Sequence, residues 1–174
     1  MRCLRILSLA GLVAVAGCVP RAEPPPPQPQ PQPRPAPQPV APPPAAVEWS
    51  LLPLTPGGWT YSNQGANAQA LFGPANSEAH FVVRCDRASR QVVLSRAGDG
   101  NALTIRTSFG ARAFPATAQR APLAMVSASL PADDRFLDSM AFSRGRFTVE
   151  MAGAPMLVIP AWPEPARVIE DCRG

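Results

Sequence analysis

The sequence predicts a mainly β fold with a minor α component: a small antiparallel β-sandwich or partly open barrel with one short helix at about residues 134–143. Short segments rich in β-branched and aromatic residues recur between clusters of turn residues. Charged residues make up only 16% of the chain, which argues against a coiled coil. Fourteen of the 24 prolines lie within residues 20–44, so residues 47–174 form a separate unit, long enough for one core.

Eight segments of this unit have the character of β-strands. They are residues 58–62, 70–73, 80–86, 91–96, 103–107, 125–130, 147–151 and 156–159. Two neighbouring pairs predict hairpins, because only four turn-forming residues separate their strands. The first hairpin has Arg-Ala-Ser-Arg at residues 87–90, and the second has Ala-Gly-Ala-Pro at residues 152–155.

One segment has helical rather than β periodicity. Asp133 or Asp134 is suited to cap a helix, and the apolar residues that follow recur on one helical face: Phe136, Leu137, Met140 and Ala141. We expect this helix to end near Gly145. Residues 164–172 are compatible with one or two further helical turns, but two nearby prolines leave that open.

The charge pattern argues against nucleic acid as a partner. The formal net charge of the chain is +4, and no lysine is present. Residues 47–174, however, contain 12 arginines and 11 acidic residues, so their charges nearly balance. A nucleic-acid-binding domain needs a concentrated basic face, and a nearly balanced domain gives no sign of one.

The first 17 residues have the pattern of a secretory signal peptide. Arg2 and Arg5 precede an apolar run at residues 6–16, which would span only ~16 Å as a helix, about half of the ~30 Å hydrocarbon core. The run ends in Val-Ala-Gly-Cys at residues 15–18. A basic start, a short apolar middle and small residues at the end are typical of exported proteins.

Val-Ala-Gly-Cys resembles the lipobox of bacterial lipoproteins. The resemblance implies cleavage before Cys18, a diacylglyceryl group on its thiol and acylation of the new amino terminus. Two or three acyl chains would anchor the protein firmly to a membrane. Val19 at the next position, by resemblance to enterobacterial sorting, favours the outer membrane, facing the periplasm. An ordinary signal peptide followed by a chance cysteine is the alternative.

Residues 18–46 are predicted to be the lipidated cysteine and a proline-rich linker. Proline fixes φ and lacks an amide donor, so the linker favours polyproline II rather than helix or sheet. At ~3.1 Å per residue, the 25 residues at 20–44 extend to at most roughly 80 Å. We interpret the linker as a stalk that spaces residues 47–174 from the membrane. The alternative is that the P-x-x-P repeats of the linker bind to a partner domain that has an aromatic groove.

Two cysteines, Cys85 and Cys172, remain after removal of residues 1–17 and lipidation of Cys18. Such a pair in an oxidising compartment usually forms a disulfide. A redox-active or metal-binding pair is the alternative, but redox catalysts favour Cys-x-x-Cys and a metal needs more ligands than two thiols and His80. We therefore expect a structural disulfide, no metal and no cofactor.

No catalytic motif is evident in the sequence. His80 is the only histidine, and no Gly-x-Ser-x-Gly elbow surrounds any serine. The candidate ligand-binding residues are the aromatic Trp59, Tyr61 and Trp162, which could stack on sugar rings, and the arginines Arg144 and Arg146, which could bind an anion. The simpler interpretation is that the aromatic residues belong to the core and that the arginines lie in a solvated turn.

Residues 80–174 faintly resemble small exported β-rich proteins of the invasion-associated locus B type. The likeness lies in a strand with one cysteine, the Asp-Asp-Arg-Phe-Leu-Asp-Ser-Met-Ala helix, Gly-Arg-Phe-Thr-Val-Glu and a terminal cysteine. It implies a non-enzymatic envelope protein. The sequence thus predicts a lipid-anchored binding or envelope-maintenance module, with peptidoglycan or an envelope protein as partner. An envelope hydrolase acting on cell-wall or glycan material is the alternative.

Overall fold

The computed structural model describes residues 48–174 with the exception of Ala66 and Ala121. The predicted signal peptide at residues 1–17, the lipidation site Cys18 and the linker at residues 18–46 therefore lie outside the described residues.

The described residues form ten strands, two α-helices and one 3-10 turn, η1 (Trp49–Leu51). The strands are β1 (Gly58–Gln64), β2 (Asn67–Gly73), β3 (Phe81–Asp86), β4 (Gln91–Ala97), β5 (Ala102–Thr107), β6 (Gly110–Pro115), β7 (Thr117–Gln119), β8 (Met125–Pro131), β9 (Arg146–Glu150) and β10 (Leu157–Pro160). The helices are α1 (Arg135–Ala141) and α2 (Pro163–Arg173).

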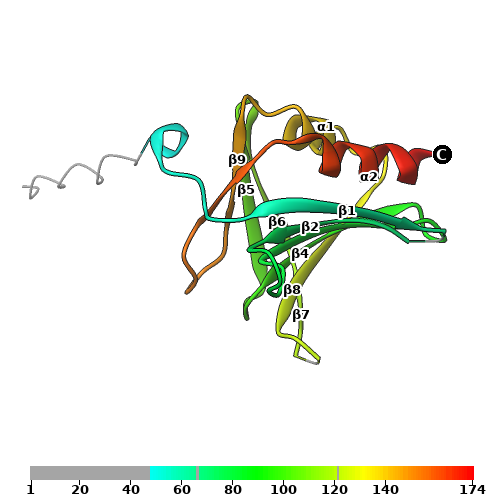
Figure 1. Cartoon of the computed structure of the whole chain (residues 1–174), viewed down its shortest axis with the longest axis horizontal. Helices are drawn as coiled ribbons and strands as arrows, with labels where there is room; N and C mark the ends of the chain where they lie inside the picture. Colours follow the sequence, from blue (N-terminus) through cyan, green and yellow to red (C-terminus); the bar gives the residue numbers. More distant parts are fainter. Residues whose placement is uncertain (1–47, 66, 121) are drawn as a thin grey trace, which may run out of the picture. The chain divides into compact units, whose positions relative to one another are not determined.

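The strands build two antiparallel sheets. The larger has the order β1-β2-β3-β4-β8-β7 and the smaller the order β10-β9-β5-β6. In Figure 1, β1 and β2 run across the view whereas β5 and β9 run steeply, so the sheets cross at a large angle. The predicted β-sandwich class is confirmed, and the described strands do not close into a barrel. Both predicted hairpins, β3–β4 and β9–β10, are also confirmed.

Alternation along the strands places the core between the two sheets. In β3, for example, Phe81, Val83 and Cys85 are buried while the residues between them are half-buried on the outer face. Phe81 of the larger sheet and Phe147 of the smaller one pack edge to face, with ring centroids 6.1 Å apart. This contact joins the two sheets at the centre of the core.

Arg96 is a buried cation that also links the two sheets. It lies on the core-facing side of β4 and donates hydrogen bonds to the carbonyl oxygens of Val149 (3.2 Å) and Pro155. Both acceptors belong to the β9–β10 hairpin of the other sheet. Burial lowers the pKa of Arg96 below its usual range, because the interior penalises the charged form.

Helix α1 begins as the sequence predicts. Asp134 is the N-cap, and its carboxylate accepts a hydrogen bond from the Phe136 amide (2.9 Å). The same carboxylate pairs with the guanidinium of Arg112 on β6. The hydrogen bond from Arg112, followed by that from the Phe136 amide, lowers the pKa of Asp134. The cap therefore fixes both the start of α1 and its distance from the smaller sheet.

Helix α2 is a complete helix of 11 residues, longer than the one or two turns that the sequence left open. Pro163 is at the first helical position, where its missing amide costs no helical hydrogen bond and its fixed φ favours the helix. The buried face consists of Pro165, Val168, Ile169 and Cys172. Through this face α2 packs on the inner side of β1, β2, β3 and β4, beside the smaller sheet (Figure 1).

Two strands were not predicted. In β6 only Phe114 is buried, and β7 has just three residues, so neither has the apolar alternation that identifies a strand. Both are edge strands: β6 ends the smaller sheet and β7 the larger one. Ala116 alone separates them, so the chain passes from one sheet to the other at this corner.

Candidate functional site

Trp59 lies in the core rather than on the surface. Only 8% of the residue is exposed, and its indole packs against the rings of Phe72 and Phe81. The indole nitrogen donates a hydrogen bond to the Pro160 carbonyl (2.9 Å), which ties β1 to the end of β10. The ring faces are therefore occupied by neighbouring residues of the protein.

Tyr61 holds α2 against β1. Its hydroxyl donates a hydrogen bond to the carboxylate of Asp171 (2.5 Å), and the amide of Asn63 donates to the same oxygen (3.3 Å). The guanidinium of Arg167 lies 4.4 Å from the centroid of the Tyr61 ring, a cation–π contact. Both the hydroxyl and one face of Tyr61 are thus engaged within the protein.

The disulfide between Cys85 and Cys172 is present in the structure, as the sequence predicts. It joins the centre of the larger sheet to the last turn of α2. Both residues are almost completely buried, at 0% and 4% exposure. Such burial is typical of a structural bond, because redox-active cysteines need access to a partner.

Trp162, Arg144 and Arg146 lie at one end of the smaller sheet. Arg146 is the first residue of β9 and pairs in register with Pro160, the last residue of β10. The antiparallel β5 ends at the same place, since its Arg106 pairs with Thr148. The β5–β6 turn, the α1–β9 loop and the β10–α2 loop therefore meet at this end.

Hydrogen bonds fix these segments to one another. The Ser108 amide donates to the Ser143 hydroxyl (2.9 Å), and the Arg144 amide donates to the Ser108 hydroxyl (2.9 Å), which joins the β5–β6 turn to the α1–β9 loop. The Ala161 amide donates to the Gly145 carbonyl (3.2 Å). The guanidinium of Arg146 donates to the Leu52 carbonyl (2.5 Å), which adds the segment after η1.

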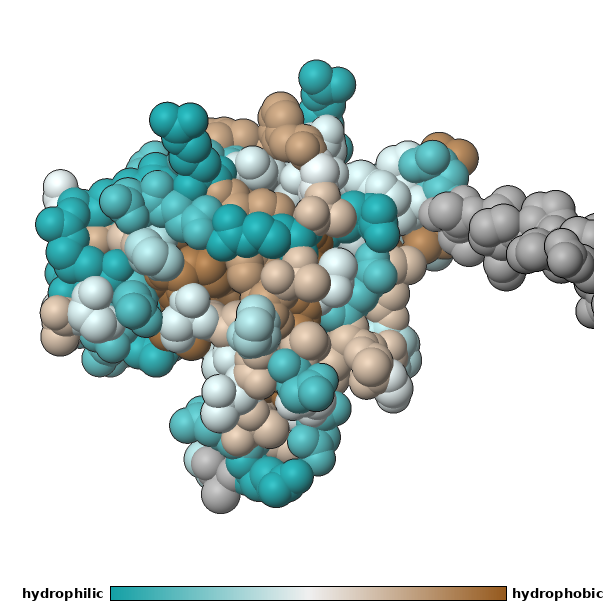
Figure 2. Space-filling view, turned by 180° about the vertical axis from the view of Figure 1, so that it is seen from behind, coloured by the Kyte–Doolittle hydropathy of each residue, from teal (hydrophilic) through white to brown (hydrophobic). Residues whose placement is uncertain are grey.

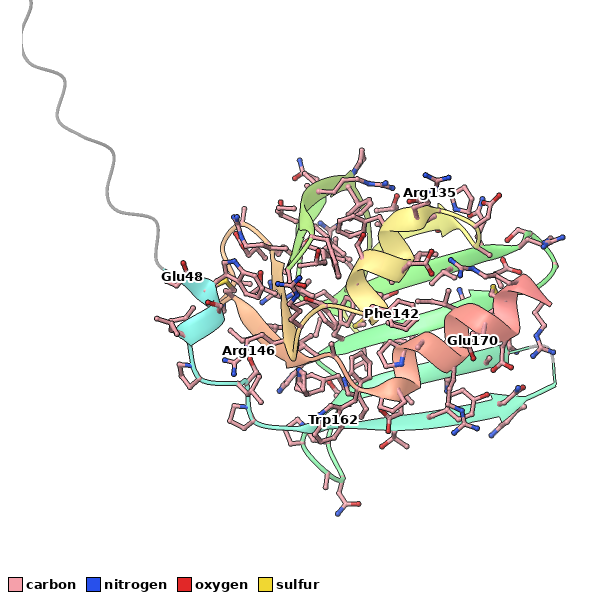
Figure 3. All side chains as sticks on the ribbon, turned by 90° about the horizontal axis from the view of Figure 1, so that it is seen from above. Glu48, Arg135, Phe142, Arg146, Trp162 and Glu170 are labelled. Carbon is pink, nitrogen blue, oxygen red and sulfur yellow. A yellow bond between two sulfur atoms is a disulfide. The ribbon has the colours of Figure 1, made fainter. Side chains whose placement is uncertain are left out.

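Exposed apolar side chains are concentrated on these segments. Five of the six exposed large apolar residues in the described chain lie in η1, in the segment after it or in these three loops: Leu51 (81%), Leu54 (42%), Phe109 (58%), Phe142 (64%) and Trp162 (47%). Figure 3 looks down on this end, with Phe142 near the start of α2, and Figure 2 shows apolar residues projecting there among hydrophilic ones. Arg144 is also exposed and, within the described part, forms no salt bridge. We call these connected segments, with their exposed residues Leu51, Phe109, Phe142, Arg144 and Trp162, the loop end.

The outer face of the larger sheet carries a second feature, a polar hollow of about 380 Å³. Its lining side chains come from β1, β2 and β3: Ser62, Gln64, Asn67, Gln69 and Arg84. In register, Ser62 pairs with Gln69, Gln69 with Arg84, and Gln64 with Asn67. No sequence pattern distinguishes these residues, because a sheet face that is simply exposed to solvent also has polar residues alternating with core residues.

Two further hollows are less suited to a ligand. One, of about 430 Å³ beside the start of β1 and the end of β2, has no charged lining side chain; besides Trp59 and Leu71 it is lined by small or uncharged residues. The other, of about 550 Å³, lies beside the disulfide and contains Arg90, Asp171 and Arg173. Asp171 already binds Tyr61, Arg173 binds Asp138, and Arg90 binds the Arg173 carbonyl. These three charged groups thus hold α2 in place, whereas Arg87 and Glu170 complete the charged lining.

His80 stands immediately before β3 and is half-buried; among the described residues, its side chain makes no hydrogen bond to a serine or a carboxylate. No group of three metal-ligating side chains occurs in residues 48–174 as far as they are described. None of the described helices has the length and apolar character needed to cross a membrane. No family model matches the chain, and neither a curated protein nor a solved structure matches it.

Proposed function

We propose that the chain is a non-catalytic binding module of the cell envelope, exported and anchored by lipid at Cys18. The support for anchoring is the lipobox-like Val-Ala-Gly-Cys at residues 15–18, after an apolar run that is too short to span a membrane. The support for binding is the loop end. The proline-rich residues 20–44 then act as a spacer between the lipid and the β-sandwich.

The concentration of exposed apolar residues at the loop end is the observation that carries the binding function. Isolated exposed apolar residues are ordinary, but several together on one surface of a soluble domain mark an interaction site. Trp, Phe and Arg are the residue types enriched in protein–protein interfaces. The loops are also held by hydrogen bonds among Ser108, Ser143 and Arg144, so the surface is already formed before a partner binds.

The partner that fits this surface is another protein of the envelope. It would offer an apolar depression for Phe142 and Trp162 and a carboxylate for Arg144. The described chain reaches the loop end through η1, which follows directly on the proposed stalk. With the lipid anchor at Cys18 in the outer membrane, facing the periplasm, this partner would be a periplasmic or outer-membrane protein.

The test is site-specific crosslinking in intact envelopes. We expect a photo-crosslinker placed at Leu51 to give a discrete adduct with an envelope protein. The paired changes Phe109→Ser and Phe142→Ser should reduce its yield at least about thirtyfold, because two apolar anchors of about 1 kcal/mol or more each are lost. Leu123→Ser is the control: Leu123 is also an exposed apolar residue (41%) but lies in the β7–β8 connection.

Two outcomes would contradict the proposal. One is an adduct yield that the paired loop-end changes leave unaltered. The other is an equal loss of adduct with Leu123→Ser, which would mean that general surface polarity rather than the loop end governs the contact.

A further inference from the structure

The polar hollow on the outer face of the larger sheet is a second candidate ligand site. We infer that it binds a carboxylate flanked by amide or hydroxyl groups, with Arg84 as the residue that recognises the charge. This inference does not depend on the lipid anchor or on the loop end, since it rests on β1, β2 and β3 alone.

The first reason is that the polar groups of the hollow are not engaged elsewhere. Among the described residues, none of the side chains of Ser62, Gln64, Asn67, Gln69 and Arg84 makes a hydrogen bond to another group of the protein. In contrast, Asn63, whose side chain points to the opposite face of β1, binds Asp171. Arg84 is half-buried, and among the described residues its guanidinium forms no salt bridge, so its hydrogen-bond donors are available to a ligand.

The second reason concerns the nearest acid. Asp86 follows two residues later on the same face of β3, yet the two side chains form no salt bridge in the described structure. The Asp86 carboxylate instead accepts hydrogen bonds from the amides of Ala88 (3.2 Å) and Ser89 (3.3 Å) in the β3–β4 turn. Hydrogen bonding by Ser89 is the main cause that lowers the pKa of Asp86, and the charge of Arg84 is the smallest. Asp86 is therefore committed to the turn, and a ligand does not have to displace it from Arg84.

The third reason is that the lining residues stand in rows across neighbouring strands. Ser62, Gln69 and Arg84 lie side by side across three strands, where directly opposed side chains are about 5 Å apart. A guanidinium presents a planar fork that matches a carboxylate, with two parallel hydrogen bonds. The amide of Gln69 and the hydroxyl of Ser62 then reach the groups next to that carboxylate. Gln64 and Asn67 close the hollow at the next row.

The lining determines the class of ligand. Most ligand sites are largely apolar, with a few polar groups that fix the orientation. This hollow has no aromatic or large aliphatic lining side chain, so a hydrophobic ligand would gain little. Its volume of about 380 Å³ suits a fragment of one or two sugar rings or two or three amino acids. An acidic sugar and the carboxyl end of a peptide share the chemistry that it recognises.

The experiment measures binding to the purified full chain by titration calorimetry. Two probes separate the two sources: a digalacturonate, and N-acetyl-Ala-Ala with a free carboxyl group. Each is paired with its neutral form, the methyl ester of the sugar acid or the carboxamide of the peptide. We expect saturable binding of at least one acid and at least tenfold weaker binding of its neutral form, because one bidentate charged pair is lost.

Variants connect this binding to Arg84. Arg84→Met should weaken binding at least tenfold, and Arg84→Lys should retain part of the affinity because it keeps the charge but not the fork. Arg120→Met is the matched control, since the Arg120 side chain is 80% exposed and pairs with Asp99, away from the hollow. If Arg84→Met does not fold, Gln69→Ala tests the same row. Binding of neither acid, equal binding of acid and neutral forms, or affinity unchanged in these variants would overturn the assignment.

Discussion

Replacement of Cys85 and Cys172 by alanine is expected to lower the free energy of unfolding by ~4–5 kcal/mol. The bond closes a loop with a sequence separation of 87 residues, and the loop-closure model assigns this loss to the greater entropy of the unlinked unfolded chain. Helix α2 should be the first element to detach when the disulfide is removed. This helix contributes Val168 and Ile169 to the core, and without the disulfide only packing and the contacts of Tyr61, Arg90 and Arg173 hold it.

Equilibrium unfolding in urea, with and without reductant, measures this effect. Reduction of the parent chain should lower its stability to that of the double alanine variant, and reductant should leave the variant unchanged. A double variant within about 1 kcal/mol of the oxidised parent would contradict a stabilising role for the bond. Two reactive thiols in the unfolded protein isolated from the periplasm would show that the bond does not form.

Phe81→Ala is expected to cost ~3–5 kcal/mol, the usual range for truncating a fully buried phenylalanine. Phe81 is the first residue of β3 and contacts Trp59 within its own sheet and Phe147 across the sandwich. The cavity would therefore open where the two sheets are joined. Because the surrounding rings belong to three strands paired in fixed register, they have little freedom to collapse into the space.

Phe142→Ala provides the matched control for that measurement. Phe142 is 64% exposed, so its truncation should change the stability by less than about 0.5 kcal/mol. Equal losses in the two variants, measured by urea unfolding, would mean that the core does not lie where Phe81 and Phe147 meet.

The fold was predictable where local sequence and tertiary packing agree. Phe81, Val83 and Cys85 alternate with outward residues, and the turn at residues 87–90 leaves only one sensible pairing partner, β4. The start of α1 was equally predictable, because Asp134 is a suitable N-cap residue and precedes an apolar helical face. In contrast, β6 has only one buried residue, and it is a strand because it pairs with β5. No local sequence pattern indicates that pairing.

The candidate sites were less predictable than the fold. The sequence does not indicate whether a tryptophan faces the solvent or the core. Only the packing distinguishes the buried Trp59 from the half-exposed Trp162. The hollow at Arg84 depends on the register between β1, β2 and β3, which places residues 62, 69 and 84 in one row. Likewise the loop end exists because β5, β9 and β10 begin or end together. Register is set by the whole core, so sequence alone does not reveal these neighbours.

The most direct test of a lipid-anchored envelope module is the mass of the protein purified in detergent from its native membrane, with fragmentation of its first peptide. We predict a chain that begins at Cys18 and carries a diacylglyceryl group on that sulfur, with a further acyl chain on the new amino terminus. A chain that still begins at Met1, or an unmodified thiol at Cys18, would contradict the account.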